Sequence, residues 1–324
     1  MLEIGLLITT NAMGLIGIAL WVFNLRRVAA GNALIEPRIQ RGSPLGFADV
    51  ILLYFFWAVG NLIPTWMVCQ SLGIEIGEIA SLKGDSQAMF SIAQTIGLLT
   101  GTLLTFVVYR LRYGPIGLAE NDRQQLTRDL VLGLSAGVMV IPFVLLFQSL
   151  IIRFIPYQHS TLEMLADKPS FWVIAATWFS AVVAAPICEE VFFRGILQGW
   201  LQRIRAGVYD CILVGGWDSV YHERNGGSLL NVDGDQTGAM ATSRQSNSVW
   251  PMVVSSFLFG MAHYGQGPAP ITLFFFGLVL GYLFRKTGSV IPCIVLHMML
   301  NGFTMFWFTL QMVYGDAPTA GLPE

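Results

Sequence analysis

About eight long apolar segments constrain what this chain can fold into more than any other feature does. They cover roughly residues 5–25, 48–72, 88–110, 129–152, 171–200, 249–264, 269–285 and 289–312, and the sixth and seventh are the short ones. A helix needs about 20 predominantly apolar residues to cross the hydrocarbon layer of a bilayer. The pattern therefore predicts an all-α fold, a polytopic transmembrane helical bundle of about eight spans.

The composition agrees with residence in a membrane. Hydrophobic residues make up 54% of the chain and charged residues only 12%, and the mean hydropathy is +0.62. Soluble domains carry about twice that share of charged residues. The net charge of −2 and the lack of a basic tract argue against a nucleic-acid partner. The four cysteines lack the paired spacing of a zinc site or a disulfide framework, so we expect them to pack as small apolar residues.

Positively charged loop residues predict the orientation. They gather in alternate loops, at residues 26–47, 110–128, 201–248 and 285–286. The positive-inside rule places these loops in the cytoplasm. Both termini then lie outside, which requires an even number of spans. The first apolar run has its arginines after it, the reverse of a cleaved signal peptide, so we expect a retained first span.

Three regions follow from this outline. Residues 1–170 hold about four spans and no diagnostic motif, residues 171–312 hold the polar motifs described next, and residues 313–324 form a C-terminal tail. A polar insertion at 208–248 interrupts the second region. Its Gly, Ser, Asn and Asp content is unsuited to a buried core, so we predict a cytoplasmic loop there.

A small set of ionisable residues lies deep in the apolar segments. These residues are Glu189, Glu190, Arg194, His263 and His297. A charge near the bilayer centre costs at least about 2.5–3.5 kcal/mol. Five such groups are costly unless they meet around a shared polar cavity, so we predict that they form an intramembrane functional site. Asp49 and Asp129 start their spans, where we expect water or lipid headgroups to reach them.

The spacing of the polar residues supports such a meeting. Glu190 and Arg194 are four residues apart and share a helix face, so they can pair. Glu189 points about 100° away on the same helix. Two later helices carry the pairs Phe259 with His263 and His297 with Asn301, each also four residues apart. Three helices thus each present one polar stripe.

These motifs, EExxxR, FxxxH and HxxxN in this order on successive hydrophobic helices, resemble those of the CAAX prenyl protease and bacteriocin-processing family of intramembrane proteases. The matching residues are Glu189, Glu190, Arg194, Phe259, His263, His297 and Asn301, and Gly277, Gly281, Gly288 and Ser289 fit a weaker segment of the family pattern. The resemblance covers residues 171–305. It implies an enzyme, a membrane-embedded endopeptidase that cuts a membrane-associated or lipidated peptide or protein. The family usually has a short loop where this chain has the 208–248 insertion.

The resemblance also implies roles for the matching positions, and the residue chemistry permits them. A glutamate in a low-dielectric cavity is a competent general base, which fits Glu189 as the residue that activates a water molecule. His263 would share that water or protonate the leaving amine. His297 and Asn301 would donate hydrogen bonds to the developing oxyanion.

The remaining motif residues have supporting roles in this scheme, and simpler readings stay open. Glu190 with Arg194 would hold the helix and the local charge in place, or form a purely structural pair. Phe259 is the candidate for substrate binding, although packing alone would explain it. The histidines and the asparagine could also serve as hydrogen bonds between helices, as polar residues in membranes often do.

A metal-dependent mechanism is the main chemical alternative. Glu189, His263 and His297 resemble the ligand set of a catalytic zinc ion. The HExxH arrangement of many zinc proteases is absent. We favour the metal-free mechanism and expect no cofactor, with a divalent metal such as zinc as the alternative.

Two other functions also stay open. Buried Glu and His residues build proton relays, which suggests a proton-coupled transporter, although no inverted repeat is evident. A catalytically inactive family member could act as a membrane scaffold or immunity partner. The expected partners are a peptide or protein substrate at the membrane and the lipid bilayer itself. Loop charges and the family's distribution suggest the bacterial inner membrane.

Overall fold

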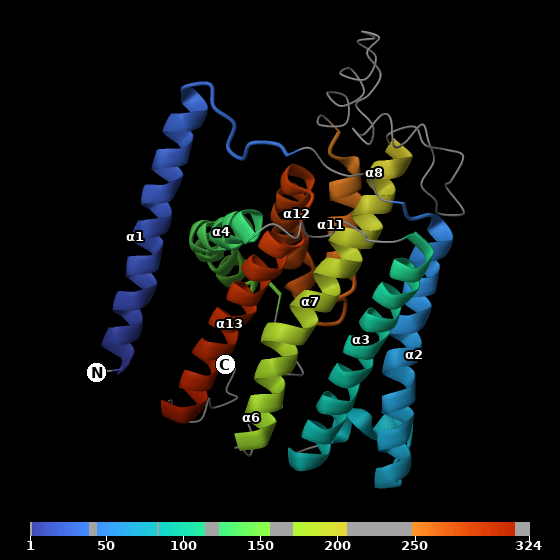
Figure 1. Ribbon diagram of the computed structural model, residues 1–324. Coiled ribbons are helices and arrows are strands. Elements are labelled where there is room, and N and C mark those ends of the chain that lie inside the picture. The colour runs from blue at the N-terminus through green and yellow to red at the C-terminus, as the bar shows by residue number, and fades with distance from the viewer. Residues whose placement is uncertain are drawn as a thin grey trace, which may run out of the picture. The chain divides into compact units, whose positions relative to one another are not determined.

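The computed structural model describes residues 2–38, 44–82, 84–113, 123–155, 171–205 and 248–314. Within these ranges the regular elements are all helical (Figure 1). The N-terminal elements are α1 (Leu2–Ala29), α2 (Phe47–Leu72), the 3₁₀ helix η1 (Ile76–Ser81), α3 (Gly84–Tyr113) and α4 (Arg123–Ile151). The predicted loop at 208–248 and the predicted tail at 313–324 fall almost entirely outside the described residues.

The C-terminal half contains one long helical run followed by three separate helices. The run consists of α6 (Phe171–Trp178), η2 (Phe179–Ala184), α7 (Ala185–Glu190), η3 (Val191–Gln198) and α8 (Gly199–Arg205), without a break between them. Both η2 and η3 are π-helical. The helices α11 (Trp250–Met261), α12 (Ala269–Thr287) and α13 (Ile291–Tyr314) follow.

These helices confirm the predicted polytopic membrane fold. Each of the eight predicted segments falls on a described helix, and seven helices are long and apolar enough to cross a membrane. The sixth segment forms α11, which has only 12 residues. At 1.5 Å per residue α11 reaches about 18 Å, well short of a hydrocarbon layer about 30 Å thick. The protein is therefore an integral, multi-pass membrane protein whose sixth apolar helix is too short to cross alone.

Glycine and proline explain why α11 stops early and α12 starts cleanly. Gly265 and Gly267 have φ angles of 94° and 58°, a left-handed conformation that glycine adopts without steric cost. Pro268 caps the start of α12. At its other end, left-handed Gly288 donates its N–H to the Phe284 carbonyl, 2.7 Å away, the usual way for a helix to close.

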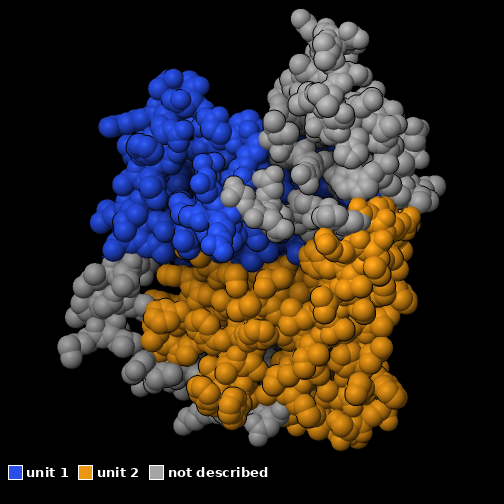
Figure 2. All heavy atoms as spheres, viewed as in Figure 1, with its two compact units in different colours: residues 1–47, 115–157, 190–296 blue, residues 48–114, 158–189, 297–324 orange. Residues whose placement is uncertain are grey.

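The described chain divides into two compact units, shown in different colours in Figure 2. Unit 1 comprises Met1–Phe47, Pro115–Tyr157 and Glu190–Leu296, and unit 2 comprises Ala48–Gly114, Gln158–Glu189 and His297–Glu324. The division runs through two of the predicted motifs. It separates Glu189 from Glu190 in the helical run and falls directly before His297 on α13.

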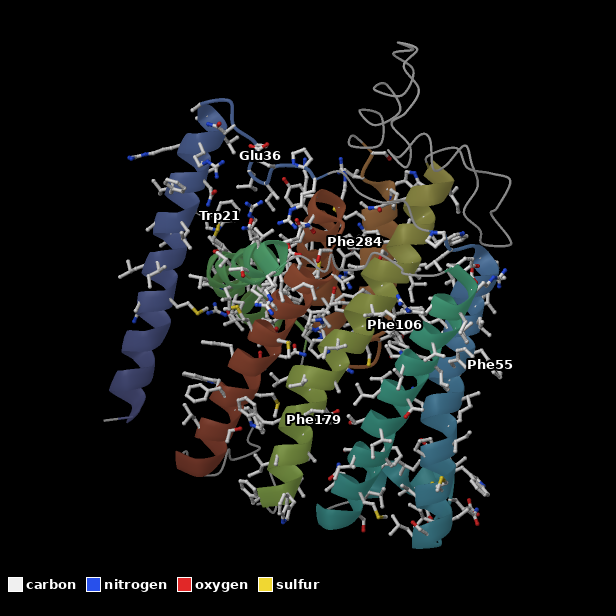
Figure 3. All side chains as sticks on the ribbon, viewed as in Figure 1. Trp21, Glu36, Phe55, Phe106, Phe179 and Phe284 are labelled. Carbon is white, nitrogen blue, oxygen red and sulfur yellow. The ribbon has the colours of Figure 1, made fainter. Side chains whose placement is uncertain are left out.

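Unit 1 is built on close contact between α11 and α12. Glycine permits this approach, since a Cβ on Gly260 would lie 2.6 Å from the Pro270 carbonyl oxygen. A Cβ on Gly281 would lie equally close to Cγ of Met252. Small residues at helix contacts are a common feature of membrane bundles. Elsewhere in the unit, Trp21 points from α1 toward α4 and donates to the Met139 carbonyl at 3.0 Å (Figure 3).

Unit 2 brings α2 and α3 together in the same way. A Cβ on Gly101 would lie 2.7 Å from the Phe56 carbonyl oxygen. The Trp57 indole donates to Thr102 across the same contact, at 3.1 Å. Such hydrogen bonds between helices supplement packing in a solvent that offers no hydrophobic effect between helices.

The two acids at the starts of spans are buried, contrary to our expectation of access to water. Asp129 is 1% exposed and pairs with Arg38 at 2.5 Å. Asp49, in the other unit, is also 1% exposed; it accepts a hydrogen bond from Tyr113 at 2.7 Å and lies 3.5 Å from the Arg112 guanidinium. Both carboxylates avoid the cost of isolated burial because basic or phenolic partners surround them.

Candidate active site

The predicted site residues divide between the two units. Unit 1 holds Glu190, Arg194, Phe259 and His263, and unit 2 holds Glu189, His297 and Asn301. Glu189 and Glu190 are the last two residues of α7, immediately before the π-helical η3. Single π-helical turns inside α-helices are rare and often occur at functional sites. The helical irregularity therefore coincides with the paired acids.

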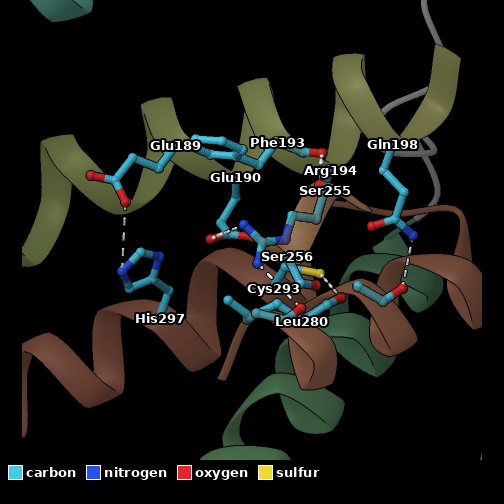
Figure 4. Close-up of polar contacts among 12 residues, drawn as sticks. Glu189, Glu190, Phe193, Arg194, Gln198, Ser255, Ser256, Leu280, Cys293 and His297 are labelled. Atoms are coloured by element: carbon cyan, nitrogen blue, oxygen red, sulfur yellow. Dashed lines mark hydrogen bonds and ion pairs between the residues drawn. The ribbon is translucent and has the colours of Figure 1, made fainter. Parts of the chain in front are cut away.

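Glu190 and Arg194 form a fully buried ion pair, as their spacing predicted. Both side chains are 0% exposed, and Nε of Arg194 lies 3.1 Å from Oε2 of Glu190. The Nη1 group donates to Oε1 at 3.4 Å, and Nη2 donates to the Gly277 carbonyl on α12 at 3.3 Å (Figure 4). The guanidinium thus links its own helix to α12 as well as neutralising the carboxylate.

Phe259 lies beneath the same guanidinium. The centre of the Arg194 guanidinium is 4.4 Å from the Phe259 ring centroid, within the range of a cation–π contact. Phe193 meets Phe259 edge to face at 5.2 Å, and Ser255 donates to the Phe193 carbonyl at 2.7 Å. Phe259 is 0% exposed. This environment suits packing against Arg194, and substrate binding by Phe259 stays a prediction.

His263 lies in the turn after α11, not within the helix as the apolar segment suggested. The helix ends at Met261, and the His263 N–H bonds the Gly260 carbonyl at 3.0 Å. Its Nδ1 is 3.0 Å from the Phe259 carbonyl oxygen. A carbonyl oxygen only accepts, so this hydrogen bond requires the proton on Nδ1 and makes Nε2 the acceptor of the neutral ring. The half-buried imidazole is thus oriented for proton transfer at Nε2.

Glu189 and His297 approach each other inside unit 2. Oε2 of Glu189 is 4.0 Å from Nε2 of His297, and their side chains are 18% and 4% exposed (Figure 4). That distance is too long for a direct hydrogen bond. Among the described residues, no group hydrogen-bonds Oε2 of Glu189. A polar separation of this length is the kind that a water molecule bridges.

Asn301 lies one turn beyond His297 on α13 and belongs to the same unit. Its Nδ2 donates to the Ala181 carbonyl in η2 at 2.8 Å. The amide of Asn301 therefore ties α13 to the helical run that carries Glu189. An amide nitrogen has two N–H donors, so this tie uses one of them.

Gln198 is a buried polar residue that the motifs did not identify. It is 0% exposed, and its Nε2 donates to the Gly281 carbonyl at 2.9 Å. It stands four residues after Arg194, so the helical spacing that linked Glu190 to Arg194 also points to it. Glutamine carries no charge, and a search for ionisable residues in apolar segments therefore passes over it.

The metal alternative finds no assembled ligand set. Within the described ranges, no three His, Cys, Asp or Glu side chains gather closely enough to hold a metal ion. Glu189 and His297 are neighbours, but with bonds of about 2.0–2.2 Å to one zinc ion the 4.0 Å separation gives an angle at the ion of about 130–180°, wider than the tetrahedral angle. The zinc alternative with Glu189, His263 and His297 as ligands stays a prediction.

Comparison with known proteins finds a family model that matches part of the chain. Residues 170–303 match the family model described as type II CAAX prenyl endopeptidase Rce1-like, and the match contains all seven predicted site residues. Among curated proteins and among solved structures, nothing matches the chain. Residues 170–303 of this multi-pass membrane protein are thus similar to the type II CAAX prenyl endopeptidase Rce1-like family.

Proposed function

We propose that the protein is an intramembrane endopeptidase that hydrolyses a membrane-associated or lipidated peptide with a water molecule activated by Glu189. The observation that carries this proposal is the pair formed by Glu189 and His297. Oε2 of Glu189 lacks a hydrogen-bond partner among the described residues and lies 4.0 Å from the imidazole. A carboxylate removed from bulk water and not neutralised by a cation is suited to general-base catalysis.

In the proposed reaction, Glu189 takes a proton from water as the water oxygen bonds the carbonyl carbon of the peptide. The carbonyl oxygen becomes an oxyanion, and His297 and Asn301 donate hydrogen bonds to it. The carbon–nitrogen bond then breaks. The proton that Glu189 took passes to the leaving amine, a transfer that we assign to Nε2 of His263, and the site returns to its starting state.

Glu190 and Arg194 serve this chemistry without taking part in proton transfer. Their carboxylate and guanidinium neutralise each other at 3.1 Å, and neither is exposed. A buried pair of this kind neither reaches substrate nor exchanges protons readily with water. We assign the two residues to holding the helical run in place.

The proposed setting is a bacterial inner membrane with both termini outside, which requires the short helix α11 to cross together with the seven longer spans. Basic residues occupy the last turns of three helices, next to loops that the positive-inside rule assigns to the cytoplasm. They are Arg26, Arg27, Arg110, Arg112, Arg285 and Lys286. A substrate that reaches the site from the membrane would supply its own apolar anchor, such as a lipid group or a helix. Labelling introduced cysteines in these loops from one side of intact cells would test the orientation, and exclusive labelling from outside would reverse it.

The central test compares peptide cleavage by the purified full-length protein and its variants in liposomes. Glu189→Ala and His263→Ala should lose cleavage of a panel of lipidated and membrane-spanning peptides. Glu36→Ala serves as the matched control, because Glu36 is exposed and remote in sequence from every motif. Variants that cleave as fast as the wild type would overturn the protease proposal, and a wild type inactive on the whole panel would favour a scaffold.

Exhaustive chelation separates the two mechanisms. The metal-free mechanism predicts full cleavage after removal of divalent metals. Loss of activity on chelation, with recovery on addition of zinc, would instead support the zinc-dependent mechanism with Glu189, His263 and His297 as ligands.

A further inference from the structure

We infer that Gln198 is a positioning residue for the proposed protease site, an inference that rests on the proposed function. Glu190, Arg194 and Gln198 are spaced four residues apart along one helical run, and all three are 0% exposed. Residues at this spacing share one helix face. They form a continuous buried polar stripe that extends beyond the EExxxR motif by one turn.

The stripe meets a matching row of main-chain acceptors on α12. Arg194 donates to the Gly277 carbonyl at 3.3 Å and Gln198 donates to the Gly281 carbonyl at 2.9 Å. The two glycines are themselves four residues apart, so the two hydrogen bonds lie one helical turn apart (Figure 4). A single bond would leave the helix free to pivot about it. Two bonds fix both its rotation and its position along α12.

Both acceptors are glycines, and the reason is steric. A Cβ on Gly277 would lie 3.1 Å from Cβ of Ser256, and one on Gly281 would lie 3.0 Å from Oε1 of Gln198. A larger residue at Gly281 would therefore displace the very amide that donates to it. The glycines let the donors of η3 reach the α12 backbone directly.

Stability alone does not account for a glutamine at this position. Oε1 of Gln198 is buried, and no described residue donates a hydrogen bond to it. Burying an unmatched carbonyl oxygen is unfavourable, whereas a leucine of similar size would avoid that cost. The Gly281 carbonyl also lies within helix α12, so loss of the glutamine donor does not orphan it. The Gln198 amide therefore helps to fix the position of the helical run along α12, at some cost in folding stability.

Register matters here because Glu189 directly precedes Glu190 in the same helical run. The direction of the Glu189 side chain follows the rotation of that run, which the hydrogen bonds of Arg194 and Gln198 hold. Catalytic groups must stay within a narrow range of positions, and a displacement of about 1 Å can reduce rates about 100-fold. Gln198 thus acts on the proposed chemistry through Glu189, without touching the substrate.

The test is Gln198→Leu in the full-length protein, with Gln202→Leu as the matched control. Gln202 lies one turn further along the run and is only partly buried, and its side chain makes no hydrogen bond within the described part of the chain. We expect Gln198→Leu to lower kcat about 10- to 100-fold with KM unchanged, while its thermal midpoint does not fall below that of Gln202→Leu. A wild-type kcat in Gln198→Leu overturns the inference, and so does a parallel loss of stability and activity.

Gln198→Glu supplies a second readout should the leucine variant fail to fold. A carboxyl group can donate to the Gly281 carbonyl only while it is protonated. The ratio of variant to wild-type kcat should therefore rise as the pH falls, and a flat ratio overturns the inference. If the wild type has no peptidase activity, the proposed function is wrong. If the wild type is active and Gln198→Leu is equally active, only the positioning role of Gln198 is wrong.

Discussion

Glu189 and Glu190 are consecutive residues of one type with opposite surroundings. Glu190 is completely buried and lies 3.1 Å from a guanidinium that also reaches a main-chain carbonyl. Glu189 is 18% exposed and lies 4.0 Å from an imidazole. A helix turns about 100° per residue, which is enough to give the two carboxylates different neighbours. Adjacent acids in a membrane helix can therefore have different surroundings, and we assign a structural role to Glu190 and the proposed catalytic role to Glu189.

This contrast also explains how two acids can occupy one apolar helix. The pair of Glu190 with Arg194 carries no net charge, so its burial imposes no isolated ion on the membrane. Of the two acids, Glu189 is the one beside an imidazole instead of a guanidinium. The number of costly groups is therefore smaller than the count of ionisable residues in the segment suggests.

The strongest test of the contrast is Glu189→Gln, which keeps the shape of the side chain and removes its basicity. Loss of a general base lowers rates by about 10²- to 10⁴-fold, so we expect kcat to fall by that factor while the thermal midpoint stays unchanged. Initial cleavage rates and a thermal melt in the same detergent measure both. If Glu189→Gln retains most of its activity, Glu189 is not the base.

Arg194→Leu should act on stability in the first place. It leaves Glu190 buried without its cation, and breaking a buried ion pair from one side costs about 3–5 kcal/mol. Unfolding in mixed micelles measures the loss. The double variant Glu190→Leu with Arg194→Leu removes both charges and should recover much of that stability. A stable but inactive Arg194→Leu would mean that Arg194 takes part in catalysis and that the Glu190–Arg194 pair is not purely structural.

His297→Ala should reduce the rate less than loss of the base does. Removal of one oxyanion donor lowers kcat by about 10²- to 10³-fold in enzymes that stabilise an oxyanion. His297→Gln retains an N–H donor and should recover part of the rate. Equal losses in the two variants would mean that His297 acts through its acid–base chemistry and not as a donor.

Phe259→Leu should have the smallest effect. A cation–π contact of this kind contributes about 0.5–2 kcal/mol, so the variant should melt at a lower temperature and keep its KM. A substrate-binding role predicts the opposite, a raised KM with unchanged stability. Measuring both quantities on one preparation decides between packing against Arg194 and contact with substrate.

Much of the fold follows from the sequence, because a bilayer demands long apolar helices and the chain provides them. The early end of α11 also has a visible cause, in the glycines and Pro268 that follow it. The π-helical turns of η2 and η3 have no such signal. A hydropathy pattern reports which residues are apolar. It does not distinguish the i→i+4 hydrogen bonds of an α-helix from the i→i+5 hydrogen bonds of a π-helix.

Individual contacts of the site were easiest to predict where both partners lie close in sequence. The pairing of Glu190 with Arg194 follows from helical spacing. The sequence did not identify Gln198, because its partner is a backbone carbonyl 83 residues away. Backbone acceptors leave no signature in the pattern of side chains. The burial of Asp129 escaped for a similar reason, since Arg38 precedes it by 91 residues. Long-range partners decide whether a charge at a span end meets water or protein.

The shortness of α11 has a consequence for the lipid around it. A hydrophobic segment shorter than the surrounding bilayer is accommodated by local thinning of that bilayer. Thinning beside the turn that carries His263 would draw the aqueous phase inward toward the residue. Catalysis would then depend on acyl-chain length, falling as liposomes are made from longer phosphatidylcholines. An activity indifferent to chain length would mean that neighbouring protein, and not deformed lipid, surrounds the end of this helix.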